Sequence, residues 1–120
     1  MSGNDIEPIQ HLLNATRYSV KGLRYAWATE AAFRYEIYVL AVAVTAAWVL
    51  GKGAVERALM IGSVLLVVVV ELINSAIETT VDRVSKDHHE LSGRAKDLAS
   101  AAVFVSLVLA AMVWLVVLLA

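Results

Sequence analysis

The stretch ALMIGSVLLVVVVELINSAIETTVD, residues 58–82, decides the fold. Its first half is almost entirely apolar, whereas its second half carries Glu71, Asn74, Glu78 and Asp82. At about 100° per residue in an α-helix, Glu71, Glu78 and Asp82 project within about 20° of one direction, and Asn74 lies about 60° to one side. An ionisable group deep in a bilayer costs roughly 2.5–3.5 kcal/mol, so such residues indicate a functional site. The stretch predicts a membrane helix whose polar stripe runs from hydrocarbon towards water.

The composition places the chain among small membrane proteins. It has 120 residues, 60% of them hydrophobic, a mean hydropathy of +0.72 and a formal net charge of −1. The small net charge gives no indication of nucleic-acid binding. The sequence has no cysteine, which excludes disulfides and cysteine nucleophiles. It also has no glycine-rich phosphate loop, and residues 1–30 lack the apolar region of a signal peptide, so we expect none.

Four helices are predicted within a single domain, residues 1–120. Segments at about 31–50, 58–84 and 92–120 are long enough to cross a hydrocarbon core of ~30 Å as helices. Residues 6–29 instead place apolar residues at helical spacing, with polar and basic residues around the rest of the helix, which predicts an amphipathic helix lying on the membrane surface. A helix packed on a protein core is the alternative for this segment. The predicted fold class is an all-α membrane protein with one surface helix and three transmembrane helices.

The basic residues predict the orientation. Four lie in the N-terminal part, and four lie around the connection between the second and third predicted transmembrane helices (Arg83, Lys86, Arg94 and Lys96), whereas only Lys52 and Arg57 flank the short turn near residue 53. Cytoplasmic loops carry the excess of lysine and arginine, so the N-terminus and the water-facing end of the polar stripe are predicted to be cytoplasmic.

Structural roles compete with functional ones for several of these residues. Glu71 could join helices by hydrogen bonding, although asparagine or serine would do so at lower cost. Glu78 and Asp82 lie near the predicted interface, where a solvated helix end costs little. The His88–His89 pair is more typical of a solvated loop than of a metal site, and His89-Glu90 does not continue into a zinc-protease motif because Gly93 stands where the second histidine is needed.

The polar motifs resemble a known family. ELINSAIETTVD, residues 71–82, followed by HELSGRAKD, residues 89–97, is similar to the signature of the bacterial integral-membrane diacylglycerol kinases. The similarity extends upstream through YSVKGLR, residues 18–24, and EAAFR, residues 30–34, and so covers nearly the whole chain. The resemblance implies a homotrimer whose sites are shared between neighbouring subunits, and which uses MgATP to phosphorylate a lipid alcohol.

The resemblance also implies roles for individual residues. Glu71 matches the general base, with Asn74 placed to orient it, and Glu30 and Glu78 match the acids that hold Mg²⁺. Lys96 and Asp97 match nucleotide contacts, where the lysine offsets phosphate charge. The further ATP-binding positions implied are His11, Tyr18, Glu30, Glu78, Asp87, His88 and His89. His11 departs from the arginine expected at its position, so that contact is predicted to be weaker or pH-dependent.

The lipid contacts that the resemblance implies are spread along the chain. They are Ala15, Ser19, Arg24, Trp27, Ala32, Arg34, Glu36, Trp48, Arg57, Glu71, Ser100 and Trp114. The tryptophans are equally expected as interfacial anchors or packing residues, and Ser100 with its neighbouring alanines as a site of close helix packing.

The predicted function is transfer of the γ-phosphate of MgATP to diacylglycerol, giving phosphatidic acid in the bacterial cytoplasmic (inner) membrane. An undecaprenol kinase of the same family is the alternative, because the shared motif does not separate the two lipids. A small ion- or drug-coupled transporter, or an ion-binding subunit of a rotary complex, is the competing class, since such chains also place one acid in a membrane helix. Magnesium-dependent binding of ATP separates the kinases from that class.

Overall fold

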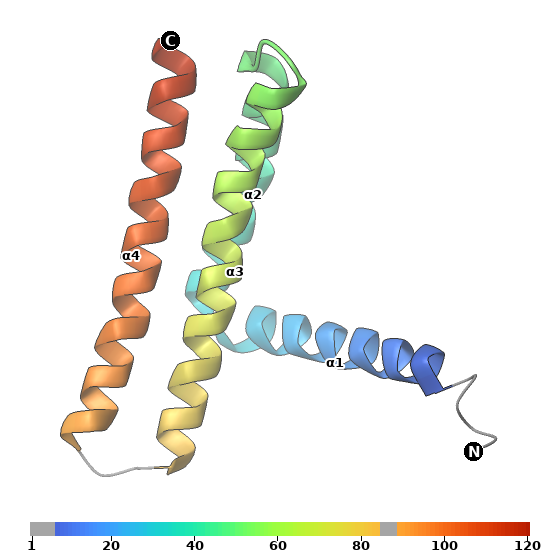
Figure 1. Ribbon diagram of the computed structural model, residues 1–120, viewed down its shortest axis with the longest axis vertical. Coiled ribbons are helices and arrows are strands. Elements are labelled where there is room, and N and C mark those ends of the chain that lie inside the picture. The colour runs from blue at the N-terminus through green and yellow to red at the C-terminus, as the bar shows by residue number, and fades with distance from the viewer. Residues whose placement is uncertain (1–6, 85–88) are drawn as a thin grey trace. The chain divides into compact units, whose positions relative to one another are not determined.

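The structure, a computed structural model, describes residues 7–84 and 89–120, and these form four α-helices (Figure 1). They are α1 (Glu7–Thr29), α2 (Ala31–Leu50), α3 (Ala54–Val84) and α4 (Glu90–Leu119). Within the described part of the chain, α2, α3 and α4 are long and apolar enough to cross a membrane. The predicted all-α class with three apolar helices is confirmed.

The described residues form two compact units, one up to Arg34 and the other from Tyr35 onward. In the first unit, α1 begins with Glu7 and Pro8, an acid and a fixed-φ residue that both suit a helix N-terminus. Helical hydrogen bonding continues past its end, because Glu30 N donates to Ala26 O at 2.9 Å and Arg34 N to Glu30 O at 3.3 Å. The guanidinium of Arg34 donates to the carbonyl of Trp27 at 2.7 Å, which satisfies one acceptor at the end of α1.

The second unit begins with most of α2 and its turn into α3. The predicted start of the second apolar helix was residue 58, but α3 begins at Ala54. The earlier start has a local cause: Glu56 Oε1 accepts a hydrogen bond from Lys52 N at 2.9 Å, and Arg57 N donates to Gly53 O at 3.1 Å. A glutamate that accepts a backbone N–H just ahead of a helix stabilises its first turn.

Helices α3 and α4 pack side by side along their length as an antiparallel hairpin (Figure 1). The residues buried on them include Ser63, Ala99 and Ser106, whose small side chains let the two backbones approach closely. Ser63 and Ser106 satisfy their hydroxyls within their own helices, at Met60 O and Val103 O. Close packing of small residues is the interaction available to helices in lipid, where apolar side chains gain little from leaving the solvent.

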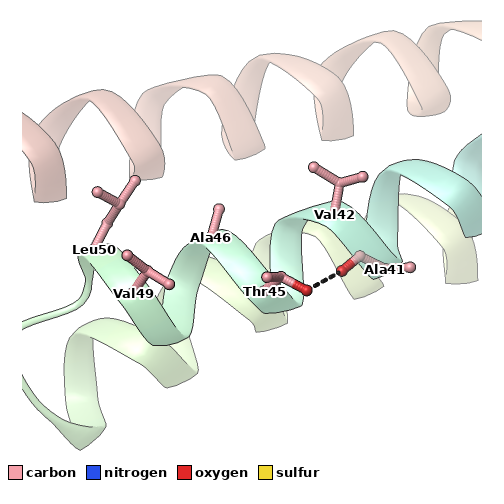
Figure 2. Close-up of a pocket in the computed structure, with 6 residues that line it drawn as sticks. All are labelled: Ala41, Val42, Thr45, Ala46, Val49 and Leu50. Carbon is pink, nitrogen blue, oxygen red and sulfur yellow. Dashed lines mark hydrogen bonds between the residues drawn. The ribbon is translucent and has the colours of Figure 1, made fainter.

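Much of the apolar surface of the second unit remains uncovered in the single chain. Figure 2 shows an open hollow lined by α2 alone, from Ala41 to Leu50, in which Thr45 Oγ1 donates to Ala41 O at 3.1 Å. The hollow therefore offers apolar side chains and a hydroxyl that is already engaged. Val42 and Val49, two of its lining residues, are 69% and 77% exposed. Such a surface suits contact with lipid or with another apolar helix.

Candidate functional site

The polar stripe of α3 becomes more exposed towards the C-terminal end of the helix. Glu71 is buried, with 7% of its surface exposed, Glu78 is half-buried and Asp82 is exposed. The three residues share one face of the helix, as the 100° spacing requires. A buried carboxylate in this position needs polar partners or a functional reason to be there. The face that carries these acids is therefore the candidate site.

Asn74 and Glu78 are joined within this face. Asn74 Nδ2 donates a hydrogen bond to Glu78 Oε1 at 3.2 Å. The other amide atom, Asn74 Oδ1, is buried and has no hydrogen-bond partner among the residues that the structure describes. A buried acceptor without a donor is costly, so this oxygen is available to a donor outside the described residues.

Lys96 on α4 meets the exposed end of the same face. Its Nζ atom lies 2.6 Å from Asp82 Oδ1, and it also interacts electrostatically with Glu78. The hairpin thus brings one cation from the first turns of α4 to two carboxylates near the end of α3. This contact is the structural link between the HELSGRAKD segment and the ELINSAIETTVD segment.

Glu36 on α2 lies near the buried end of the stripe. Its carboxylate interacts electrostatically with that of Glu71, so two helices contribute an acid here. Its Oε2 atom is buried and has no hydrogen-bond partner in the described ranges. Like charges on neighbouring helices are unfavourable unless a cation, a proton or a donor is shared between them.

The nucleotide-binding positions predicted around residues 87–89 are only partly described. Asp87 and His88 lie outside the described residues. His89 is the N-cap of α4, and its Nδ1 atom accepts a hydrogen bond from Leu91 N at 3.0 Å. This side chain therefore stabilises the start of the helix that carries Lys96. Asp97 and Ser100 follow on α4 and are exposed.

The predicted positions near the N-terminus belong to the other compact unit. Six of them lie on α1 and are exposed: His11, Ala15, Tyr18, Ser19, Arg24 and Trp27. Ser19 Oγ donates to Ala15 O at 2.9 Å, so its hydroxyl is satisfied within the helix. Glu30 lies at the junction of α1 and α2, and Ala32 and Arg34 form the first turn of α2.

Three predicted lipid contacts make internal contacts at the opposite end of the hairpin from Lys96. Arg57 Nη2 donates to Trp48 O at 3.2 Å, and its guanidinium lies 4.8 Å from the centroid of the Trp48 ring. Trp114 Nε1 donates to Met60 O at 3.0 Å. These bonds tie α2 to α3 and α4 to α3, which is the packing role that the sequence left open for the tryptophans.

Comparison with known proteins agrees with these motifs. The sequence pattern of the family described as prokaryotic diacylglycerol kinase matches residues 17–118. The chain belongs to this family. That match includes all of α3, all but the last residue of α4 and every residue of the polar face.

Relatives in the diacylglycerol kinase family are similar along most of their length. The chain is 48% identical over 116 residues to the Diacylglycerol kinase of Escherichia coli K12, covering 96% of this chain and 94% of that one. It is 48% identical over 106 residues to the Diacylglycerol kinase of Haemophilus influenzae, covering 88% of this chain and 90% of that one. It is also 48% identical over 111 residues to the Diacylglycerol kinase of Pseudomonas aeruginosa, covering 92% of this chain and 90% of that one. Membership of this family and three apolar helices make the chain a membrane protein.

The ion pair between Asp82 and Lys96 was not predicted from the sequence. Asp82 belonged to the polar stripe, but no functional role was assigned to it from the sequence. Its contact with Lys96 depends on how α3 and α4 pack, which the helical period of either segment does not reveal. The available signal was that Asp82 shares a helix face with Glu71 and Glu78.

Proposed function

We propose that the chain is an ATP-dependent diacylglycerol kinase, which transfers the γ-phosphate of ATP to the free hydroxyl of diacylglycerol and releases phosphatidic acid and ADP. The observation that carries this proposal is the family membership over residues 17–118. The close approach of Lys96 to the acids of α3 supports it, because phosphoryl transfer requires positive charge at the phosphate and an acceptor for one proton.

Glu71 is the proposed proton acceptor. The hydroxyl oxygen of the lipid forms a bond to the γ-phosphorus while the bond from that phosphorus to the β–γ bridging oxygen breaks. The hydroxyl proton passes to the Glu71 carboxylate, and the bridging oxygen leaves with ADP. Burial of Glu71 supports this role, because water that could hydrolyse ATP is excluded from a buried carboxylate.

Lys96 is the proposed cation at the transferred phosphate, with Asp97 beside it as a further nucleotide contact. An ammonium carries three donors, and the ion pair with Asp82 engages only one of them. The remaining donors can bind phosphate oxygens, whose charge spreads during transfer. His11, Tyr18 and the segment 87–89 are proposed to complete the ATP site.

Glu78 is proposed as a magnesium ligand. Mg²⁺ is commonly held by one or two carboxylates together with substrate phosphates, and the family resemblance implies the same role for Glu30. The Asn74 amide donates to Glu78 Oε1 and would hold this carboxylate in place for the ion. When bound, Mg²⁺ supplies charge neutralisation at the β- and γ-phosphates. The buried Oδ1 of Asn74 would accept a donor from the substrate or from a neighbouring subunit.

The membrane arrangement is part of the same proposal. Helix α1 is proposed to lie on the cytoplasmic surface of the bacterial inner membrane, because its apolar side chains Ile9, Leu12 and Leu13 are exposed beside basic ones. The lipid substrate is proposed to lie along α1 and the start of α2, near Arg24, Trp27, Arg34 and Glu36. The excess of basic residues at this end supports the orientation.

A homotrimer with shared sites is proposed as the working form. An apolar face of α2 is uncovered, and the described residues offer no donor to the buried Asn74 oxygen. A neighbouring copy can supply apolar contacts to the first and polar groups to the second. A monomer with full activity contradicts this part of the proposal.

The test is phosphate transfer from labelled MgATP in mixed micelles that contain diacylglycerol and undecaprenol side by side. We expect labelled phosphatidic acid as the main product and no transfer when Mg²⁺ is chelated. Labelled undecaprenyl phosphate as the main product would show that the lipid substrate is undecaprenol, phosphorylated by the same mechanism. If a folded protein labels neither lipid and shows no magnesium-dependent affinity for ATP, the kinase proposal is wrong.

A further inference from the structure

Asp82 forms a short ion pair with Lys96. Its Oδ1 atom lies 2.6 Å from Lys96 Nζ, compared with 3.3 Å in the Glu90–Arg94 pair. It joins two helices, whereas Glu90 and Arg94 are one turn apart on the same helix. The side chains of Lys96 and Asp82 are 44% and 64% exposed, so water screens the pair and its contribution to stability is small. A contact of this kind has more effect on where the lysine lies than on whether the protein folds.

The flexible side chain of Lys96 must be held in one position to act on a phosphate. Its ammonium stands at the end of a flexible four-carbon stem, and fixing that stem at a phosphate costs rotamer entropy at each turnover. Asp82 and Glu78, both on α3, draw the ammonium to the face that also carries Glu71. Of these two acids, only Asp82 forms an ion pair with it in the described structure. The lysine is therefore already held against α3 before substrate arrives.

We propose that Asp82 is a positioning residue, which holds the Lys96 ammonium beside α3 so that two of its three donors face the transferred phosphate. The inference rests on the proposed function, because it takes Lys96 as the cation at that phosphate. Asp82 itself touches no reacting atom. Its negative charge opposes ATP binding slightly, so its benefit appears in the transition state, where the placed lysine meets the phosphate charge as it spreads over the oxygens.

The experiment uses the full chain in diacylglycerol mixed micelles and compares Asp82→Asn, Asp82→Glu and Glu90→Gln. Asp82→Asn keeps the shape and removes the charge, whereas Asp82→Glu keeps the charge on a longer stem. Glu90→Gln is the matched control, because it removes a carboxylate from an exposed pair on the same helix as Lys96. For each protein, kcat, KM for MgATP and the midpoint of unfolding in denaturing detergent are measured.

We expect kcat of Asp82→Asn to fall about tenfold with KM for MgATP changed by less than about twofold. Asp82→Glu should recover much of the loss, and Glu90→Gln should behave as the unmodified protein. In a Lys96→Met background, Asp82→Asn should cause no further loss, because the two residues act as one unit.

Three results would overturn the inference. One is an unchanged kcat in Asp82→Asn. Another is a loss that follows the unfolding midpoint and persists in the Lys96→Met background, which indicates a structural role. The third is a lower KM for MgATP with normal kcat, which shows that Asp82 competes with phosphate for the lysine. Failure of the proposed function is a separate observation, because the unmodified protein would then produce no labelled phosphatidic acid.

Discussion

The indole N–H of Trp114 on α4 donates a hydrogen bond of 3.0 Å to the backbone carbonyl of Met60 on α3. Met60 is fully buried, so the bond lies in the closely packed part of the hairpin. The same carbonyl also accepts the hydroxyl of Ser63 at 2.9 Å. A donor that loses its acceptor in an apolar environment is costly, and this bond therefore fixes how the two helices align.

Trp114→Phe should destabilise the protein by about 0.6–2 kcal/mol, the range for hydrogen bonds between membrane helices. Phenylalanine keeps one aromatic ring but removes both the N–H and part of the indole, so a control with the same truncation is needed. The free energy of unfolding in denaturing detergent is the measurement. Trp48→Phe is the control, because the Trp48 indole makes no hydrogen bond in the described structure, and its ring can still face Arg57. Equal stability of Trp114→Phe and the unmodified protein, with a raised KM for diacylglycerol, would instead favour a direct lipid contact.

Glu71→Gln should lower kcat by about 10²–10⁴-fold, because the amide cannot take the hydroxyl proton. Binding of MgATP should be nearly unchanged, since Glu71 is proposed to contact the lipid hydroxyl rather than the nucleotide. The measurements are the rate of lipid phosphorylation and equilibrium binding of an ATP analogue that cannot transfer its γ-phosphate. Normal turnover in this variant removes Glu71 from the role of base.

Lys96→Met should lower kcat by about 10²–10³-fold, the usual effect of removing one charge-stabilising donor from a transition state. Arg94→Gln is the matched control, because Arg94 is a cation on the same helix whose described partner is Glu90 at 3.3 Å. The comparison distinguishes two effects: a positive charge needed at the position of Lys96, and the general attraction of ATP to a basic surface. If both variants lose activity equally, the effect belongs to the net charge of this surface.

Much of this arrangement could be predicted from the sequence, because it depends on local periodicity. The shared face of Glu71, Glu78 and Asp82 follows from the geometry of one helix. The partner of Asp82 does not, since the residue of α4 that lies opposite depends on how side chains of two helices interlock. The hydrogen bond from Trp114 could not be predicted from the sequence either, because its acceptor is a backbone carbonyl, which every residue possesses.

The early start of α3 shows that hydropathy alone does not locate the end of a membrane helix. Hydropathy placed the beginning near residue 58, where the apolar run starts, but the helix begins at Ala54 because Glu56 accepts the N–H of Lys52. A charged residue next to a membrane segment therefore contributed to the helix instead of ending it. The catalytic and metal-binding roles proposed for the polar residues remain predictions.

Glu78→Gln should raise the Mg²⁺ concentration needed for half-maximal rate by about 10–100-fold, as weakened metal sites commonly do. The amide can still accept from Asn74 Nδ2, so the hydrogen bond at 3.2 Å need not be lost. The measurement is the rate of lipid phosphorylation as a function of free Mg²⁺ at saturating ATP. An unchanged magnesium dependence with a reduced rate would place Glu78 outside the metal site.

Gly51→Ala should destabilise the turn between α2 and α3 without changing the chemistry. A Cβ atom at Gly51 would lie 2.6 Å from Ala47 O and 2.6 Å from Arg57 Cγ. The carbonyl cannot retreat freely, because it already accepts Gly51 N at 2.8 Å. Relief of the clash would displace the Arg57 side chain from Trp48. We expect a loss of about 1–3 kcal/mol in the free energy of unfolding, the usual cost of overpacking.

Gly62→Ala is the control for this turn, because a Cβ at Gly62 meets nothing within 4 Å. Alanine is the better helix former, so this variant should be as stable as the unmodified protein or up to about 1 kcal/mol more stable. Unfolding midpoints in denaturing detergent compare the two variants, and kcat for the folded fraction should be normal in both. A stable Gly51→Ala protein would show that the turn can relax, and that the contact between Arg57 and Trp48 does not depend on glycine at this position.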